Sequence, residues 1–367
     1  MLGRLDVGVA VFFVLSGFLL GRPFALWAVG AARRPDLARY AARRAVRVLP
    51  AYWLMLTAVL LVLRPEEVRT LADAGWQYLL AQTYGEYRLI PSISHVWSLN
   101  TEVAFYAALP LLALPLALAA RSRGRAVQRQ LGLLALAAVG GLVFTGLAHT
   151  GAVGDQSLAP QWVPARFDWF AWGLALAVLS TPLGRSSRPG RLLGDLATAP
   201  GLCWAAAAAL FWLACSPIAG GRGLVSFTSS EAVVREVLYG LVAVLLVAPL
   251  VAGPPRGGAV RAVLQSRTGV WLGQVSYGIF LWHKLVLELL VRGFDLEIFS
   301  FPFWPVLLAV VLGTLLLAWA SWHLVERPLL ELVDRRIARR VRPPQGSSAG
   351  AEREQHEQLR DDGVRAG

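Results

Sequence analysis

Nine apolar runs separated by polar loops constrain the fold of this chain more than any other feature. Only 16% of its 367 residues are charged and 56% are hydrophobic, whereas a soluble domain carries about 25% charged residues. A helix needs roughly 20 apolar residues to cross a bilayer, where the backbone must satisfy its own hydrogen bonds. The sequence therefore predicts an all-α, polytopic transmembrane helix bundle. The predicted spans are residues 7–27, 46–63, 98–119, 131–149, 167–180, 199–214, 233–252, 270–291 and 304–325.

The loops between these runs alternate in charge. The intervening loops hold six arginines, whereas twenty lie in the loops at 28–45, 120–130, 181–198 and 253–269 and in the segment 331–342. Arginine-rich loops stay on the cytoplasmic side of a membrane. We therefore predict an integral protein of the plasma (inner) membrane with a cytoplasmic C-terminus. The same loops account for the net charge of +12, so we predict no nucleic-acid partner.

The number of spans conflicts with the start of the chain. Nine spans that end in the cytoplasm must begin outside, yet residues 1–6 contain no cleavable signal with a basic n-region. Either the first span inserts with its N-terminus outside, or another span lies upstream of Met1, and we favour the second explanation. Residues 1–335 are then an N-terminally short membrane domain. Residues 336–367, rich in Pro, Gly, Ser and charges, are predicted to be a disordered cytoplasmic tail.

Three arginines stand at the entrance to the second run, in the sequence RRAVRVLPAYW (43–53). Arg44 and Arg47 are three residues apart, so a helix would place them on one face, where two guanidinium groups can bind one anion. Arg43 precedes them. Two interpretations stay open, namely a cluster that fixes membrane orientation and an anion-binding site.

The third run carries a carboxylate inside the membrane. On a helix, Ser98, Glu102 and Tyr106 share one face. An intramembrane acid is a functional candidate because its burial is costly. The alternative is that Glu102 pairs with an arginine or caps a helix end together with Asn100.

The segment GVWLGQVSYGIFLWHK (269–284) carries a second polar face. Ser276, Tyr277 and His283 lie close together on it. His283 could relay protons or polarise a substrate oxygen, or it could form an interhelical hydrogen bond. Lys284 is expected to extend to the membrane surface or to pair with Glu288, its i+4 neighbour.

Three further features are predicted to be structural. Arg166 and Asp168, at the head of the fifth run, are expected to form an ion pair. Glu326 and Arg327, at the end of the last run, are expected to pair within the bundle or at its cytoplasmic edge. The small residues in FFVLSGF (12–18) form a notch that lets two helices approach closely.

Six segments, in this order, resemble the acyltransferase-3 family of integral membrane O-acyltransferases. They are GVAVFFVLSGFLLGRPF (8–24), RRAVRVLPAYW (43–53), HVWSLNTEVAFYAALP (95–110), the stretch 167–173, LGQVSYGIFLWH (272–283) and VERP (325–328). They are spread over nearly all of the chain up to residue 335. The resemblance implies a ten-helix bundle that transfers an acyl group, usually acetyl, from cytoplasmic acyl-CoA to a hydroxyl group of a saccharide, glycolipid or sugar-bearing metabolite.

The resemblance also implies roles for individual residues. The family's paired arginines map onto Arg44 and Arg47, which would hold the phosphates of CoA. Its acid maps onto Glu102 and its histidine onto His283, the two candidate catalytic residues. The candidate supporting residues are Arg43, Trp97, Ser98, Tyr106, Asp168, Ser276 and Tyr277.

The family's first helix, which carries an arginine and a histidine presumed to be the general base, has no counterpart before Arg4. We therefore expect that helix to be encoded upstream of Met1. Without it, His95 or His283 would have to serve as the base, or the chain would be a catalytically inactive family member.

The leading hypothesis is base-assisted transfer of an acetyl group from acetyl-CoA to a small or lipid-linked saccharide, without a metal ion. Membrane lipid is the other expected partner, and the sequence does not indicate an oligomeric state. A transporter or flippase of a lipid-linked sugar is the alternative, besides the inactive or truncated family member. Broken spans in matching halves would favour transport, and the sequence shows no such symmetry.

Overall fold

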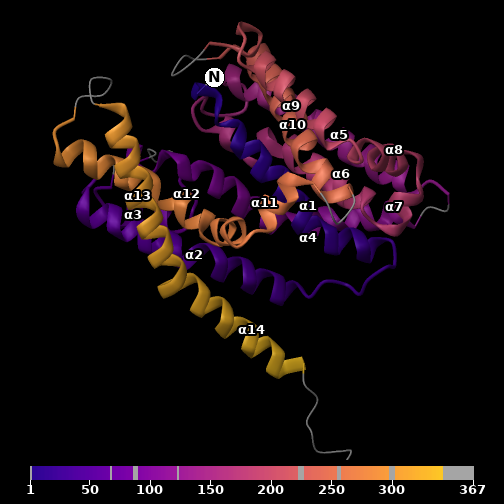
Figure 1. Cartoon of the computed structure of the whole chain (residues 1–367), viewed down its shortest axis with the longest axis horizontal. Helices are drawn as coiled ribbons and strands as arrows, with labels where there is room; N and C mark the ends of the chain where they lie inside the picture. Colours follow the sequence, from indigo (N-terminus) through magenta and orange to yellow (C-terminus); the bar gives the residue numbers. More distant parts are fainter. Residues whose placement is uncertain are drawn as a thin grey trace, which may run out of the picture.

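The computed structural model describes residues 2–66, 68–85, 90–121, 124–221, 227–253, 258–296 and 302–341. Every regular element within these ranges is helical, which confirms the predicted all-α bundle (Figure 1). Five arginines of the charge count lie outside the described residues, namely Arg88, Arg123, Arg222, Arg256 and Arg342.

A helix covers most of each of the nine predicted runs. These helices are α1 (Val7–Ala28), α2 (Leu37–Val62), α4 (Trp97–Ala120), α5 (Ala126–Thr150), α6 (Phe167–Leu179), α9 (Pro200–Ala214), α10 (Ser229–Ala252), α12 (Arg267–Gly293) and α13 (Phe303–Ser321). The shorter helices are α3 (Leu71–Tyr78), α7 (Pro182–Ser186), α8 (Arg188–Ala197), α11 (Ala259–Gln265) and α14 (Arg327–Val341). Short 3₁₀ helices precede several of them, among them η2 (Pro91–Val96) before α4 and η4 (Val163–Arg166) before α6.

Six helical segments in the described part are long and apolar enough to cross a membrane, and α8 and α9, which meet at 91°, make a seventh if they form one span. Two predicted spans differ from this pattern. Helix α6 has only 13 residues, or about 20 Å at 1.5 Å per residue. Helix α12 has 27 residues, but Gln274, His283 and Lys284 make it more polar.

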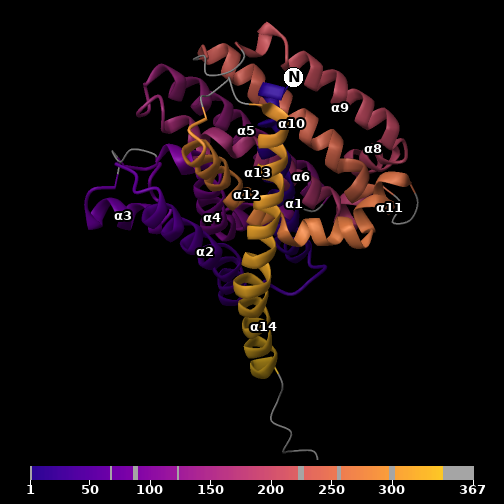
Figure 2. The ribbon, with the colours of Figure 1, turned by 60° about the vertical axis from the view of Figure 1, so that its left-hand side comes forward.

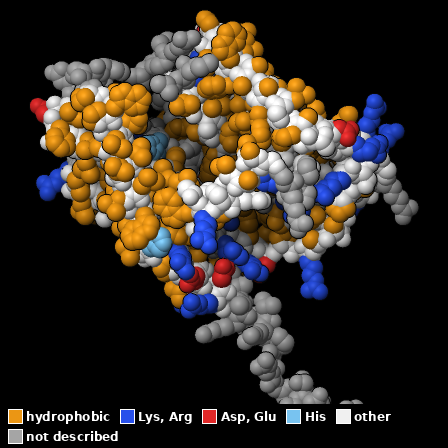
Figure 3. Space-filling view, in the orientation of Figure 1, with side chains coloured by type: hydrophobic (Ala, Val, Ile, Leu, Met, Phe, Trp, Pro, Cys, Tyr) orange, Lys and Arg blue, Asp and Glu red, His pale blue; other side chains and the backbone are white. Residues whose placement is uncertain are grey.

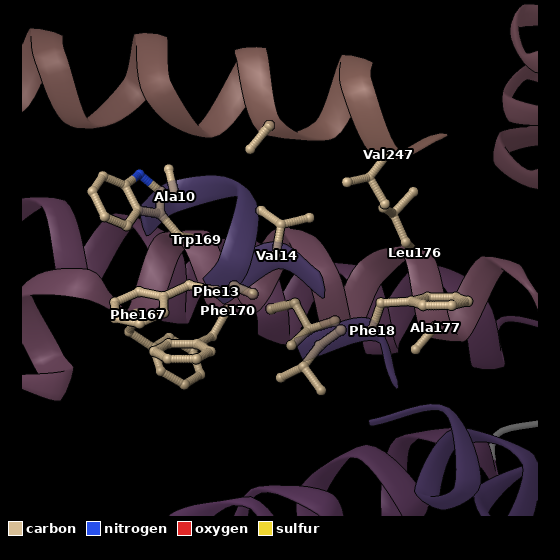
Figure 4. Packing of buried hydrophobic residues seen from close by; sticks show 14 of the residues in the cluster. Ala10, Phe13, Val14, Phe18, Phe167, Trp169, Phe170, Leu176, Ala177 and Val247 are labelled. Carbon is tan, nitrogen blue, oxygen red and sulfur yellow. The ribbon is translucent and has the colours of Figure 1, made fainter. Parts of the chain in front are cut away.

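The first hydrophobic cluster forms where α1 crosses α6. A Cβ atom added to Gly17 would overlap the carbonyl oxygen of Phe170, and one added to Gly173 would overlap that of Val14. The notch around Gly17 therefore has the predicted packing role. One turn before Gly17 on α1, the ring of Phe13 stacks on that of Phe170 with centroids 4.5 Å apart. Figure 4 shows these side chains between the helices.

A second hydrophobic cluster joins α2, η2, α4 and α12. Figures 1 and 2 show these elements on the side of the bundle away from α9 and α10. Tyr106 of α4 packs against both clusters. The boundary between the two clusters is therefore the place where polar groups of α1, α2 and α4 can meet.

The last span continues beyond the membrane domain predicted from the sequence. After α13, the π-helical turn η6 (Trp322–Glu326) leads directly into α14, which runs to Val341. Residues 342–367, most of the predicted tail, lie outside the described residues. Figure 3 shows Lys and Arg side chains gathered along the lower and right-hand edges of one face, where Figure 1 places α14, α7 and α8.

Candidate active site

Glu102 lies at the boundary of the two hydrophobic clusters, and its carboxylate is held by hydroxyl groups. The side chain is only 3% exposed. Its Oε1 accepts a hydrogen bond from Ser16 Oγ at 2.8 Å and another from the hydroxyl of Tyr106, one turn along α4. No Lys or Arg nitrogen in the described part of the chain lies within 4.0 Å of it. Asn100 is no cap, because it lies inside α4 and donates to Thr83 Oγ1 at 3.3 Å.

Tyr106 connects Glu102 to the arginines of α2. The guanidinium carbon of Arg44 lies 5.9 Å from the centroid of the Tyr106 ring, within the range of a cation–π contact. Tyr40, one turn before Arg44, donates to the carbonyl oxygen of Tyr106 at 3.1 Å. Both Arg44 and Arg47 lie near enough to Glu102 to act on it electrostatically. The sequence-predicted residues Arg44, Glu102 and Tyr106 therefore form one group.

Arg47 forms an ion pair with Glu326 in η6, directly after α13. Its Nη1 donates to Glu326 Oε2 at 2.7 Å, and the Glu326 side chain is 1% exposed. The guanidinium carbon lies 5.6 Å from the Tyr277 ring and 5.1 Å from the Trp322 ring. Arg47 thus joins α2 to α12 and η6. Arg44 has no such acidic partner among the described residues, so it is the more available of the two for an anion.

Arg43 lies apart from this group. Its Nη1 is 3.3 Å from Asp334 Oδ1, and both side chains are about half exposed. Exposed ion pairs of this kind contribute little to stability. Arg43 therefore belongs to the contact between α2 and α14.

The predicted ion pair of Arg166 and Asp168 is wrong. Arg166 instead pairs with Glu236 of α10, inside the bundle, with its guanidinium carbon 5.3 Å from the Trp97 ring. The alternative partner outcompetes Asp168 because Glu236 faces Arg166 across the helix contact. Both carboxylate oxygens of Asp168 are buried without a hydrogen-bond partner. Trp97 and Asp168 thus lie around the Arg166–Glu236 pair, not beside Glu102.

His283 packs against His95, and no described contact joins it to Glu102. The two imidazole centroids are 4.7 Å apart, and His283 Nδ1 lies 2.8 Å from the carbonyl oxygen of Phe280 in its own helix. Lys284 donates to Ser94 Oγ at 2.6 Å and to the carbonyl oxygen of Pro91. It pairs with η2 and not with Glu288, whose carboxylate lies 3.8 Å from Arg292.

Three predicted supporting residues bond to backbone groups. Ser98 donates to the carbonyl oxygen of His95 at 3.2 Å and Ser276 to that of Gly273 at 2.9 Å. Tyr277 donates to the carbonyl oxygen of Val48 at 2.8 Å while its ring faces Arg47. Only Tyr277 of these three therefore contacts the arginine group, and Ser276 is exposed.

Sequence reasoning missed three members of the site. Ser16 was assigned to helix packing alone, although a hydroxyl in an apolar helix is itself a polar signal. Tyr40 precedes the apolar run, and nothing in its sequence context indicates a site. Glu326 was expected to pair, but its partner in α2 is 279 positions away and no local pattern identifies it. No group of three or more His, Cys, Asp or Glu side chains that could hold a metal ion occurs in the described ranges.

Comparisons with known proteins identify the family. The acyltransferase-3 family model, described as "Acyltransferase domain", matches residues 4–323. The exopolysaccharide production protein ExoZ of Rhizobium meliloti (strain 1021) is 29% identical over 343 residues, covering 91% of each chain. The putative peptidoglycan O-acetyltransferase YrhL of Bacillus subtilis (strain 168) is 30% identical over 358 residues, covering 91% of this chain and 52% of YrhL.

A third relative, nodulation protein 10 of Rhizobium leguminosarum bv. viciae, is 26% identical over 354 residues, covering 91% of this chain and 84% of that protein. No solved structure matches the chain significantly. The family model covers most of the chain, and long apolar helices lie in the same region. The resemblance of the six segments is therefore confirmed: the chain belongs to the acyltransferase-3 family and is a multi-pass membrane acyltransferase.

Proposed function

We propose that the chain transfers an acetyl group from acetyl-CoA, arriving from the cytoplasm, to a hydroxyl group of a small or lipid-linked saccharide. The observation that carries this proposal is the Arg44–Tyr106–Glu102 group. In it, Arg44, which has no acidic partner in the part of the chain that the structure describes, and the buried Glu102 carboxylate both contact Tyr106. Two arginines supply the charge that a phosphate ester requires, and the carboxylate can accept a proton. The names of YrhL and ExoZ support a saccharide acceptor.

The same geometry supports a division of roles. Arg44 and Arg47 would bind the phosphates of CoA at the cytoplasmic end of α2. Glu102 would take the proton of the acceptor hydroxyl as its oxygen attacks the thioester carbonyl. The new C–O ester bond forms, the C–S bond breaks, and CoA leaves as the thiolate, which the proton then neutralises. Ser16 and Tyr106 would hold the carboxylate in place.

The orientation follows from the arginine-rich loops. The C-terminus would lie in the cytoplasm and the protein in the plasma (inner) membrane, with membrane lipid around it. This arrangement puts Arg44 and Arg47 on the side from which acetyl-CoA arrives. The described residues need no metal ion for any of these steps.

A transfer assay tests the proposal. Membranes containing the full chain are incubated with radiolabelled acetyl-CoA, and alkali-labile label is measured in the saccharide and lipid-linked saccharide fractions. We expect Arg44→Gln/Arg47→Gln to lower kcat/KM by about 100-fold or more, because hydrogen bonds to charged groups are worth about 1.5–3 kcal/mol each. Arg121→Gln/Arg125→Gln, which removes the same charge from the α4–α5 loop, should leave transfer unchanged.

Two results would contradict the proposal. If Arg44→Gln/Arg47→Gln still formed ester-linked label at the normal rate, the two arginines would not bind the donor. No transfer by the unaltered chain, in membranes where acetyl-CoA binding is measurable, would favour an inactive family member or a transporter.

A further inference from the structure

A cavity of about 760 Å³ lies among α6, α8, α10 and α11, apart from the Glu102 group. Its lining includes Leu176 at the end of α6 and Leu250 near the end of α10, but neither Arg44 nor Arg47. Small-molecule sites typically enclose 300–1,000 Å³, so this cavity has the volume of a ligand site. The proposed acyl-transfer mechanism does not use this cavity.

The wall formed by α7 and α8 is fixed by close backbone packing. Thr181 Oγ1 accepts from the Gly184 amide at 3.0 Å, and Ser187 Oγ accepts from the Gly190 amide at 3.2 Å. These two N-caps begin α7 and α8 in succession. A Cβ atom added to Gly190 would overlap the carbonyl oxygen of Gly184. The two short helices therefore hold their side chains at defined positions around the cavity.

The lining is strongly basic. It contains the four arginines Arg185, Arg188, Arg191 and Arg261 and one acid, Asp195. None of the four has an acidic side chain within 4.0 Å in the described ranges. Arg191 donates to the carbonyl oxygen of Ser186, and Arg261 to those of Pro249 and Leu250. Backbone carbonyls position these two guanidinium groups but leave their positive charges unneutralised.

Apolar side chains make up much of the rest of the surroundings. Leu192 and Leu196 on α8 are 57% and 52% exposed, although α8 also carries Arg188 and Arg191. A short helix with leucines and arginines that turns by 91° into α9 has the character of a helix lying in the interface plane. The same loop is one of the arginine-rich group predicted to be cytoplasmic.

From the unpaired arginines, the apolar walls and the volume together, we infer that this cavity binds a phosphate ester at the membrane surface, at a site separate from the proposed donor site. Guanidinium groups bind phosphate oxygens in pairs, and basic pockets between membrane helices on the cytoplasmic side bind anionic headgroups. The phosphate could belong to a phospholipid headgroup or to a free phosphate ester. The leucine walls suit a ligand that also carries hydrocarbon.

Native mass spectrometry of the purified full chain tests this site. Phosphatidylglycerol is titrated against phosphatidylcholine, and the dissociation constant of each is measured. We expect phosphatidylglycerol to bind about tenfold more tightly than phosphatidylcholine, because Arg185 and Arg188 are exposed and an exposed charge pair contributes only up to about 1 kcal/mol. Arg185→Gln/Arg188→Gln should remove that preference. Asp195→Asn, which removes the one acid of the lining, should strengthen binding about threefold or less.

The control is Arg121→Gln/Arg125→Gln, which removes two exposed arginines from another loop of the arginine-rich group and should leave the dissociation constant unchanged. If both double variants lost affinity for phosphatidylglycerol equally, unspecific surface charge would explain the binding and the site would be overturned. The site would also be overturned if Arg185→Gln/Arg188→Gln kept both its thermal stability and its preference for phosphatidylglycerol.

Competition with CoA and with inorganic phosphate distinguishes the two sources of the phosphate. Displacement of phosphatidylglycerol by either one at millimolar concentration assigns the cavity to a free phosphate ester. Retention of phosphatidylglycerol assigns it to a lipid headgroup. A titration in which none of the three probes binds would overturn the inference.

Discussion

The buried carboxylates Glu102 and Glu236 have the same chemistry but opposite surroundings. Glu236 is 0% exposed and pairs with Arg166, whose guanidinium carbon lies 5.3 Å from the Trp97 ring centroid and 5.1 Å from that of Trp169. Glu102 is 3% exposed, and within the described ranges its carboxylate accepts hydrogen bonds from the hydroxyl groups of Ser16 and Tyr106 and has no Lys or Arg nitrogen within 4.0 Å. A buried ion pair is neutralised and costly to break, whereas a carboxylate that accepts from neutral hydroxyls keeps its capacity for a proton. This difference is the reason why Glu102, and not Glu236, is the proposed proton acceptor.

The largest effect is expected when Glu102 loses its capacity for a proton. Glu102→Gln keeps the size of the side chain and can still accept from both hydroxyls, so folding should change little. General acid–base catalysis contributes about 10²–10⁴-fold, and kcat for acetyl transfer should fall by that amount. The measurement is the transfer rate at saturating acetyl-CoA beside a thermal unfolding curve. Glu331→Gln, at an exposed acid of α14, is the control and should transfer at the normal rate. If Glu102→Gln also transferred at the normal rate, Glu102 would have no more part in catalysis than Glu236.

Substitutions in the Arg166–Glu236 pair should lower the free energy of unfolding. Arg166→Gln removes the guanidinium that pairs with the buried Glu236, and breaking a buried pair costs about 3–5 kcal/mol. The free energy of unfolding should fall by that amount, measured by thermal or denaturant unfolding of the purified chain. The double variant Arg166→Gln/Glu236→Gln should lose less than the sum of its single variants, because the two side chains interact. Additive losses would show that the ion pair is not what stabilises this region.

The sequence was sufficient for elements that depend on local patterns. Apolar runs of membrane-spanning length located a helix in every predicted position. The arginine spacing predicted a shared anion site for Arg44 and Arg47, and that role stays a prediction. The sequence could not predict ion pairs between distant segments. Arg166 has acids both at Asp168 and at Glu236, and only the crossing of α6 and α10 decides between them. Similarly, Arg47 and Glu326 meet because the π-helical turn η6 brings the end of the last span onto α2.

The hydroxyl groups around Glu102 allow a finer test of the same contrast. Ser16→Ala and Tyr106→Phe each remove one donor to the carboxylate and leave the hydrophobic contacts in place. Hydrogen bonds to charged groups contribute about 1.5–3 kcal/mol, so each change should lower kcat by about 10- to 100-fold, less than Glu102→Gln does. Because the Tyr106 ring also faces Arg44, Phe at this position keeps that cation–π contact, and KM for acetyl-CoA should stay nearly constant.

Initial rates over a range of acetyl-CoA concentrations separate the two kinetic parameters. Ser216→Ala, at a partly exposed serine that donates to the carbonyl oxygen of Leu213 in the last turn of α9, is the matched control and should change neither. If Ser16→Ala changed KM but not kcat, the hydroxyl would serve binding and not the position of the carboxylate. If the losses in Ser16→Ala and Tyr106→Phe were absent from the Glu102→Gln background, both hydroxyls would act through Glu102, as their shared acceptor oxygen requires.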